Sequence, residues 1–202
     1  MQWIERLRDL TRITGITEIA RRYFVMNAFD GVLTMLGVII GAHTSGVLEP
    51  RLVIGTGLAA TLAMGISGAS GAYMTEKAEQ TRELKKLESA LLVRLDDTRH
   101  EDASRFAYVF AALVDGVSPA LGALAVLSPI IMANAGLLDI EAAFWASIAV
   151  GIAVLVALGL YLAKVSDERL WVYGSQMLVV GVLTVLLCMA IAMVFETPAL
   201  PA

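Results

Sequence analysis

The stretch AFDGVLTMLGVIIGA, residues 28–42, has the composition of a membrane-spanning helix apart from one carboxylate, Asp30. The stretch LVDGVSPALGALAVL, residues 113–127, repeats this arrangement with Asp115. An Asp at the centre of a membrane helix costs about 2.5–3.5 kcal/mol on insertion scales, and its short side chain does not easily reach the headgroups. Each carboxylate therefore needs an oxygen-seeking cation, a proton or a structural hydrogen bond to offset that cost.

The composition of the whole chain points to a membrane protein. Of its 202 residues 58% are hydrophobic and 17% charged, whereas soluble domains have about 45–50% apolar and 25% charged residues. The net charge of −4 says little about partners, and the lack of a basic cluster with interleaved aromatic residues argues against a nucleic-acid partner. A single cysteine, Cys188, excludes an intramolecular disulfide and a cysteine-ligated metal cluster.

Five segments are long enough to cross a bilayer, which takes about 20 residues each. They are residues 23–44, 51–74, 105–133, 141–164 and 173–195. The sequence thus predicts an all-α integral membrane protein with five transmembrane helices. The two prolines of the third segment leave open whether that helix is broken or bent.

The basic residues predict the orientation. In the five-span arrangement every Lys and Arg except Arg51 falls on one side of the membrane. Cytoplasmic loops carry the excess of Lys and Arg, so we expect a multi-pass protein of the cell's inner membrane with a cytoplasmic N-terminus and an external C-terminus.

The segments suggest an internal repeat. Aligning Asp30 with Asp115 also matches Gly31 with Gly116 and Gly37 with Gly122. We therefore predict two repeated hairpins and a fifth helix. The expected organisation is an N-terminal amphipathic segment (1–22), hairpin one (23–74), a charged cytoplasmic helix (75–104), hairpin two (105–164), and a fifth transmembrane helix with a short external tail (165–202). The amphipathic segment either lies on the inner leaflet or packs on the protein.

Polar and small residues recur at helical spacing on the first two spans, and thioether sulfur from Met together with an Asp carboxylate would suit iron(II) or a similar borderline metal. The candidate residues of a metal or transport path are Asn27, Asp30, Thr34, Met35, Met64, Ser67 and Asp115. Pro119 cannot donate to the carbonyl of Asp115, which adds an unpaired acceptor near that carboxylate. The competing interpretations are structural: hydrogen-bonding carboxylates and methionines that fill gaps in the core.

Three glutamates follow the second span on one helix face. Glu76, Glu79 and Glu83 have the spacing i, i+3 and i+7 and could collect divalent cations at the cytoplasmic mouth. Their basic neighbours offer the alternative of an ordinary salt-bridged surface. Motifs of metalloproteases, serine hydrolases and phosphate loops are missing, so we expect no enzymatic activity.

The chain resembles the vacuolar iron transporter family, also called the yeast calcium-cross-complementer-like family. The resemblance rests on NAFDGVLTMLGVIIGA in the first span, on AMGISGASGAYMTEKAEQ at the end of the second, and on five spans with a charged helical insert. It implies export of iron(II), sometimes manganese(II), against protons by a homodimer, with Asp30 lining a path between the two first-span helices.

The resemblance also implies that the metal is the transported ion and that no cofactor is permanently bound. Where relatives have a Met and, four residues later, a Glu at the end of the second span, this chain has Gly68 and Ala72. Two alternatives stay open: a non-transporting membrane assembly module, and a proton-coupled carrier of another small solute.

Overall fold

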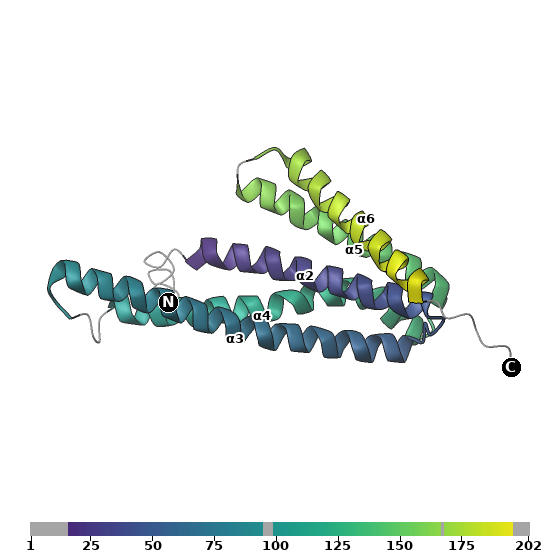
Figure 1. The fold of residues 1–202 in the computed structure, drawn as a ribbon, viewed down its shortest axis with the longest axis horizontal. Helices are drawn as coiled ribbons and strands as arrows, with labels where there is room; N and C mark the ends of the chain where they lie inside the picture. The colour runs from purple at the N-terminus through teal and green to yellow at the C-terminus, as the bar shows by residue number, and fades with distance from the viewer. Residues whose placement is uncertain (1–15, 95–98, 167, 196–202) are drawn as a thin grey trace. The chain divides into compact units, whose positions relative to one another are not determined.

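The computed structural model describes residues 16–94, 99–166 and 168–195, and helices account for nearly all of them (Figure 1). The helices are α2 (Ile16–Thr44), α3 (Pro50–Leu91), α4 (Arg99–Asn134), α5 (Ile140–Val165) and α6 (Leu170–Phe195). Each contains a stretch long and apolar enough to cross a membrane. The predicted all-α architecture with five spans is thereby confirmed for the described part of the chain.

All five helices are longer than their predicted spans, and α3 exceeds its span the most. The second span continues without interruption to Leu91, so α3 has 42 residues, and its polar second half extends the membrane-spanning half. The predicted amphipathic segment lies mostly outside the described residues, and only its last part, 16–22, is seen as the start of α2.

Helix α4 runs unbroken through Pro119 and Pro129. The third span is therefore not broken. Such continuity is possible because neighbouring helices can compensate for the hydrogen bond that a proline removes from a membrane helix.

The chain divides into two compact units. Among the described residues, unit 1 contains those up to Asn27 together with those within Met64–Ser118, and unit 2 contains Ala28–Ala63 and those from Pro119 onward. Helices α2, α3 and α4 each contribute one segment to both units.

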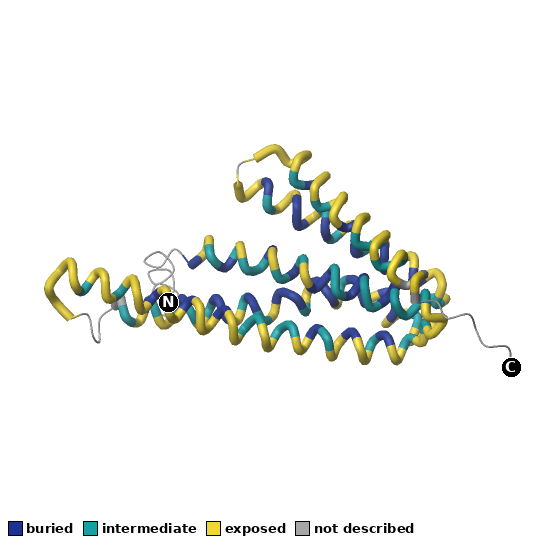
Figure 2. The backbone as a smooth tube through the Cα atoms, viewed as in Figure 1, coloured by how far each residue is buried: buried dark blue, intermediate teal, exposed yellow. Residues whose placement is uncertain are grey.

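Unit 2 has the larger apolar core. Val32 and Leu36 of α2, Leu127 of α4 and Leu155 of α5 are completely buried there, and Phe144 nearly so. Figure 2 shows buried stretches in dark blue along the helices. Helix α6 packs on α5 within the same unit. Long aliphatic side chains dominate this core. Of the residues predicted to form the transport path, it contains Met35.

Unit 1 relies on close contact between helix backbones. A Cβ placed on Gly65 of α3 would lie 2.6 Å from the carbonyl oxygen of Gly116 on α4. Small residues allow this approach, which is how membrane helices commonly associate.

Both predicted hairpins turn in the same way. After α2, Gly46 has a φ of +68° and its N–H donates to the His43 carbonyl at 3.1 Å. After α4, Gly136 has a φ of +74° and donates to the Ala133 carbonyl at 2.9 Å. Glycine is favoured at both positions because the left-handed conformation is costly for residues with a Cβ. The likeness concerns the turns, and the full internal repeat stays a prediction.

Candidate functional site

Asp30 lies on the surface of the protomer. It is the central residue of the 29-residue helix α2, which puts it about 20 Å from either helix end at 1.5 Å per residue. Its side chain is exposed, and no hydrogen bond or ion pair reaches its carboxylate within the described part of the chain. Met26, four residues earlier and thus on the same helix face, is 54% exposed. A carboxylate and a thioether are therefore presented outward from the middle of a membrane-spanning helix.

Asp115 has the opposite surroundings. It is only 4% exposed and lies in unit 1, where the Asn27 side-chain amide donates a hydrogen bond to its Oδ1. The same amide group also donates to the Tyr23 carbonyl at 2.9 Å. Asn27 thus fixes the carboxylate of α4 to α2, and the structure brings these two sequence-predicted site residues into direct contact.

Gly68 provides the space for this carboxylate. A Cβ placed on Gly68 of α3 would lie 2.5 Å from Asp115 Oδ2. Any side chain at this position would therefore displace the Asp115 carboxylate. The position at which the family resemblance implies a methionine is filled in this protein by a carboxylate from another helix.

A second buried carboxylate lies further along α3 in the same unit. Glu76 is 6% exposed and accepts a hydrogen bond of 2.9 Å from the Tyr23 hydroxyl. Gln80, one turn later, is 8% exposed. Neither Tyr23 nor Gln80 is among the site residues predicted from the sequence. The four-residue spacing of Ala72, Glu76 and Gln80 could have identified Gln80, because it puts these residues on one helix face. That face is the buried face of α3 in this region.

The other two glutamates of the predicted collecting group are on the surface. Glu79 and Glu83 are exposed, and Glu79 makes an ion pair of 3.7 Å with Arg82. Within the described residues no group of three or more His, Cys, Asp or Glu side chains is arranged to hold a metal ion. One protomer therefore does not bring Glu76, Glu79 and Glu83 together as a metal site.

The remaining candidates differ in exposure. Met35 is 1% exposed, and its sulfur fills the space beside Gly57 in the core of unit 2. Thr34 and Met64 are half-buried. Ser67 is exposed and belongs to a face of α3 on which Thr56, Ala63, Ser67 and Ser70 are all exposed. Helix α3 thus presents a face of small and hydroxyl-bearing residues at the protomer surface.

Together these features define a helical, multi-pass membrane protein with polar groups both inside and on the surface of its spans. A sequence model of the VIT family matches residues 21–103. The uncharacterised protein MJ0645 of Methanocaldococcus jannaschii is 32% identical over 181 residues, which cover 88% of this chain and 91% of that protein. The chain belongs to the VIT family, as its sequence motifs predicted. This membership indicates a membrane transporter of metal ions, in a family of transporters rather than of enzymes.

Proposed function

We propose that the protein exports a divalent metal ion, iron(II) or manganese(II), from the cytoplasm in exchange for protons, and that it works as a homodimer. The observation that carries this proposal is the exposed, unpartnered carboxylate of Asp30 at the centre of α2, as the described residues show it. The metal is the cargo of this protein and not a resident cofactor.

The exposure of Asp30 favours a second copy of the chain as its cover. A carboxylate facing lipid at this depth would cost about 2.5–3.5 kcal/mol. Pairing two copies through this face of α2 removes the side chain from lipid and places two Asp30 carboxylates on one path. The exposed hydroxyl-bearing face of α3 needs cover for the same reason.

The ligand types on this surface suit the proposed ions. Carboxylate oxygen is a hard ligand that binds manganese(II), and the thioether of Met26 is soft, so together they fit a borderline ion such as iron(II). Thr34, four residues after Asp30 on α2, supplies a further oxygen atom.

Export of a divalent cation needs an energy source. A membrane potential that is negative inside opposes it by about 2.3 kcal/mol per charge per 100 mV. Proton entry down its gradient would supply this energy. We assign to Asp115 the role of a second polar site or proton carrier. Of the three predicted glutamates, the exposed Glu79 and Glu83 would attract ions at the cytoplasmic entrance, whereas Glu76 is buried against Tyr23.

The test is transport by purified protein in proteoliposomes. Vesicles with an acidic interior are given iron(II), manganese(II) and a panel of other divalent ions outside. Asp30→Asn should lower the rate of uptake at least tenfold, whereas Glu49→Gln, which removes an exposed carboxylate at the end of a loop, should leave it unchanged. Unchanged flux in Asp30→Asn would contradict the proposal. Wild-type vesicles that transport no metal, combined with a loss of dimers in Asp30→Asn, would favour the assembly-module alternative.

A further inference from the structure

A hollow of about 300 Å³ lies between α3 and α4 in unit 1. Its lining residues are distant from Asp30 in the sequence. Lys77 and Thr81 of α3 and Ser104, Arg105 and Tyr108 of α4 contribute to its lining. Two cationic side chains from different helices therefore border one space.

The aromatic residues beside the hollow indicate its depth in the membrane. The rings of Tyr73 and Tyr108 meet edge to face with centroids 5.1 Å apart, and Lys77 Nζ lies 5.6 Å from the centre of the Tyr73 ring. Tyrosines gather at the membrane–water interface, with Lys and Arg just outside it. On α3 the run 52–75 contains no charged residue, so Lys77 is the first cation after the apolar part of the helix. The hollow is therefore at the level of the lipid headgroups.

The charges in the hollow favour an anion. Lys77 and Arg105 are exposed cations, while the lining includes one carboxylate, Glu101, which lies near the Arg105 guanidinium. Arg105 is also hydrogen-bonded to Tyr108. Among the lining residues two cations stand against one carboxylate, and a second carboxylate, Asp102, lies near Arg105 outside the lining. The Ser104 and Tyr108 hydroxyls can donate to phosphate oxygens.

The surface next to Arg105 is suited to an acyl chain. Val109 and Leu113 follow Arg105 at four-residue intervals and hence share its helix face. Val109 is 42% exposed and Leu113 is 61% exposed. A molecule whose phosphate contacts Arg105 would thus meet an apolar surface on the membrane side.

We propose that this hollow binds the headgroup phosphate of an anionic phospholipid, with Lys77 and Arg105 as its cationic contacts and an acyl chain along Val109 and Leu113. Basic pockets between transmembrane helices on the cytoplasmic side bind such headgroups in other membrane proteins. A free phosphate ion would use the cations but not the apolar surface.

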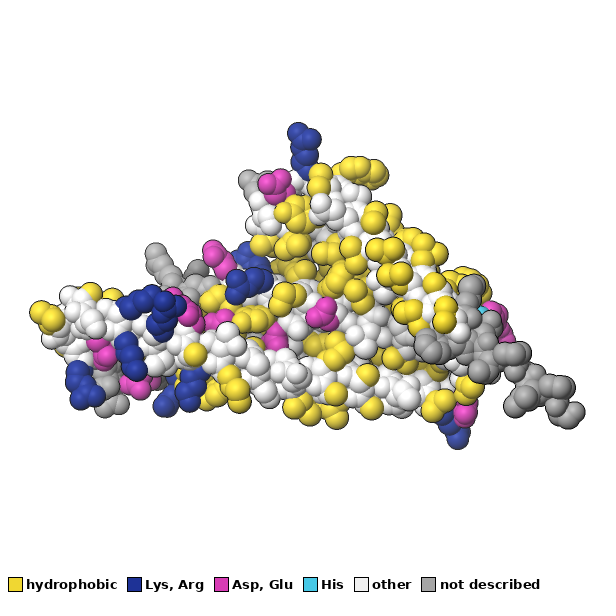
Figure 3. Space-filling view, in the orientation of Figure 1, with side chains coloured by type: hydrophobic (Ala, Val, Ile, Leu, Met, Phe, Trp, Pro, Cys, Tyr) yellow, Lys and Arg dark blue, Asp and Glu magenta, His cyan; other side chains and the backbone are white. Residues whose placement is uncertain are grey.

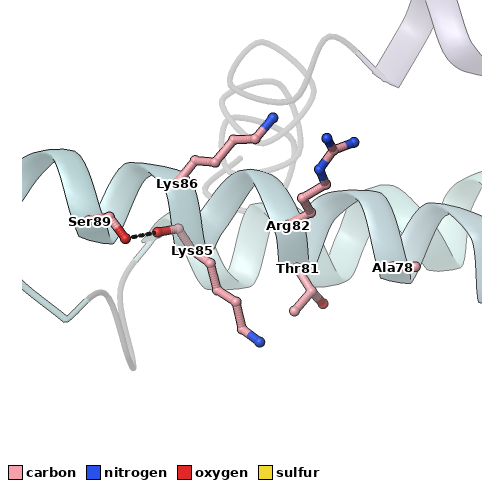
Figure 4. A pocket seen from close by; sticks show the side chains of 6 residues that line it. All are labelled: Ala78, Thr81, Arg82, Lys85, Lys86 and Ser89. Atoms are coloured by element: carbon pink, nitrogen blue, oxygen red, sulfur yellow. Dashed lines mark hydrogen bonds between the residues drawn. The ribbon is translucent and has the colours of Figure 1, made fainter.

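A second hollow, of about 590 Å³, adds positive charge on the outer part of α3 and shares Thr81 with the first. Figure 3 shows Lys and Arg side chains gathered over this end of α3. In Figure 4, Arg82 and Lys86 point to one side of the helix, and Thr81 and Lys85 point to the other. The Arg82 and Lys86 side is therefore a matched control, since it offers the same two charges outside the proposed headgroup site.

The experiment measures lipid binding by the full-length protein and does not depend on transport. Protein in phosphatidylcholine–detergent micelles is titrated with phosphatidylglycerol, and bound lipid is counted by native mass spectrometry. Near a membrane surface each Lys or Arg contributes roughly a fivefold gain in affinity for anionic lipid. Lys77→Gln/Arg105→Gln should therefore bind phosphatidylglycerol about 25-fold more weakly. Arg82→Gln/Lys86→Gln should retain at least half of the bound lipid.

Three outcomes would overturn the proposal: equal loss in both double variants, equal binding of phosphatidylcholine and phosphatidylglycerol, or displacement of the lipid by millimolar inorganic phosphate. If Lys77→Gln/Arg105→Gln does not fold, as judged by its thermal unfolding in phosphatidylcholine alone, Lys77→Gln decides the question. It should bind about fivefold more weakly than wild type, and unchanged binding would contradict the site.

Discussion

The carboxylate of Asp115 is confined on two sides, by the Asn27 amide and by the Cα of Gly68. Gly68→Ala would add a methyl group 2.5 Å from Asp115 Oδ2. Because an Asp side chain is short, it cannot move away while keeping its hydrogen bond. We expect a loss of about 1–3 kcal/mol in the free energy of unfolding, as is typical of overpacked cores. Unfolding of the purified protein in mixed micelles measures this loss.

Gly71→Ala is the control for this prediction. It lies one turn further along α3, and a Cβ there meets nothing within 4 Å. Replacing a helical glycine with alanine should stabilise this position by up to about 1 kcal/mol. Combining Gly68→Ala with Asp115→Ala should cost less than the sum of the two single changes, because the clashing group is gone. Strict additivity would show that the contact between Gly68 and Asp115 is unimportant.

The hydrogen bond from Tyr23 to Glu76 should contribute to the stability of unit 1. Tyr23→Phe keeps the ring but removes the donor from a carboxylate that is 6% exposed. Loss of one partner of a buried hydrogen bond should destabilise the protein by about 1–3 kcal/mol. The melting temperature of the variant should fall, whereas Tyr73→Phe, whose ring meets that of Tyr108 edge to face and which is 37% exposed, should melt like wild type. Identical melting of both variants would contradict a structural role for this bond.

The sequence predicted that both aspartates are exceptional, but not that they differ. Asp30 and Asp115 are each followed by Gly-Val, yet one is exposed and the other is buried and hydrogen-bonded. Burial depends on which face of the helix meets a neighbour. In a membrane helix all faces are apolar, so hydrophobic periodicity does not identify that face. The partners of Asp115 come from positions 27 and 68, and no local pattern links these to residue 115.

At the scale of the helices, the sequence was more informative. Long apolar runs identified all five spans, because about 20 apolar residues are the minimum that crosses a bilayer. The charged segment predicted for residues 75–104 is helical up to Leu91, where it continues the second span as the second half of α3. The continuity of α4 through Pro119 did not follow, because the effect of a proline depends on the packing around it.

The start of α5 allows a test of helix capping. The Asp139 carboxylate accepts hydrogen bonds from the N–H groups of Glu141 at 3.0 Å and Ala142 at 3.4 Å. Asp139→Ala removes this N-cap and should lower the free energy of unfolding by about 1 kcal/mol. Asp139→Asn should retain most of the stability, since an Asn side chain also caps helices well. Equal destabilisation of both variants in thermal unfolding would point to the charge of Asp139 and not to its cap.

At the scale of the whole molecule, the surface of the single chain is itself informative. Met26 and Asp30 on α2 are exposed, and so are the hydroxyl-bearing residues Thr56 and Ser67 on α3. Polar groups on the outside of membrane helices are expensive unless another protein surface or water covers them. The sequence could predict the polar face but not that it points outward. That property favours the proposed homodimer over a monomer with an internal path.

The proposed dimer predicts a cross-link through α2. Cys188 is the only cysteine of the chain, so Cys188→Ala gives a background without thiols. In this background Met26→Cys, at a position that is 54% exposed, should form a disulfide-linked dimer in membranes treated with a mild oxidant. The reason is that the two copies of α2 would face each other in the proposed dimer. Val179→Cys on α6 is the matched control, since it is 63% exposed but outside the proposed interface. Dimers on a non-reducing gel should appear for Met26→Cys alone. If Val179→Cys cross-links efficiently and Met26→Cys does not cross-link, the contact between copies is on α6. Asp30 would then have to be covered by something other than the Asp30 face of a second copy.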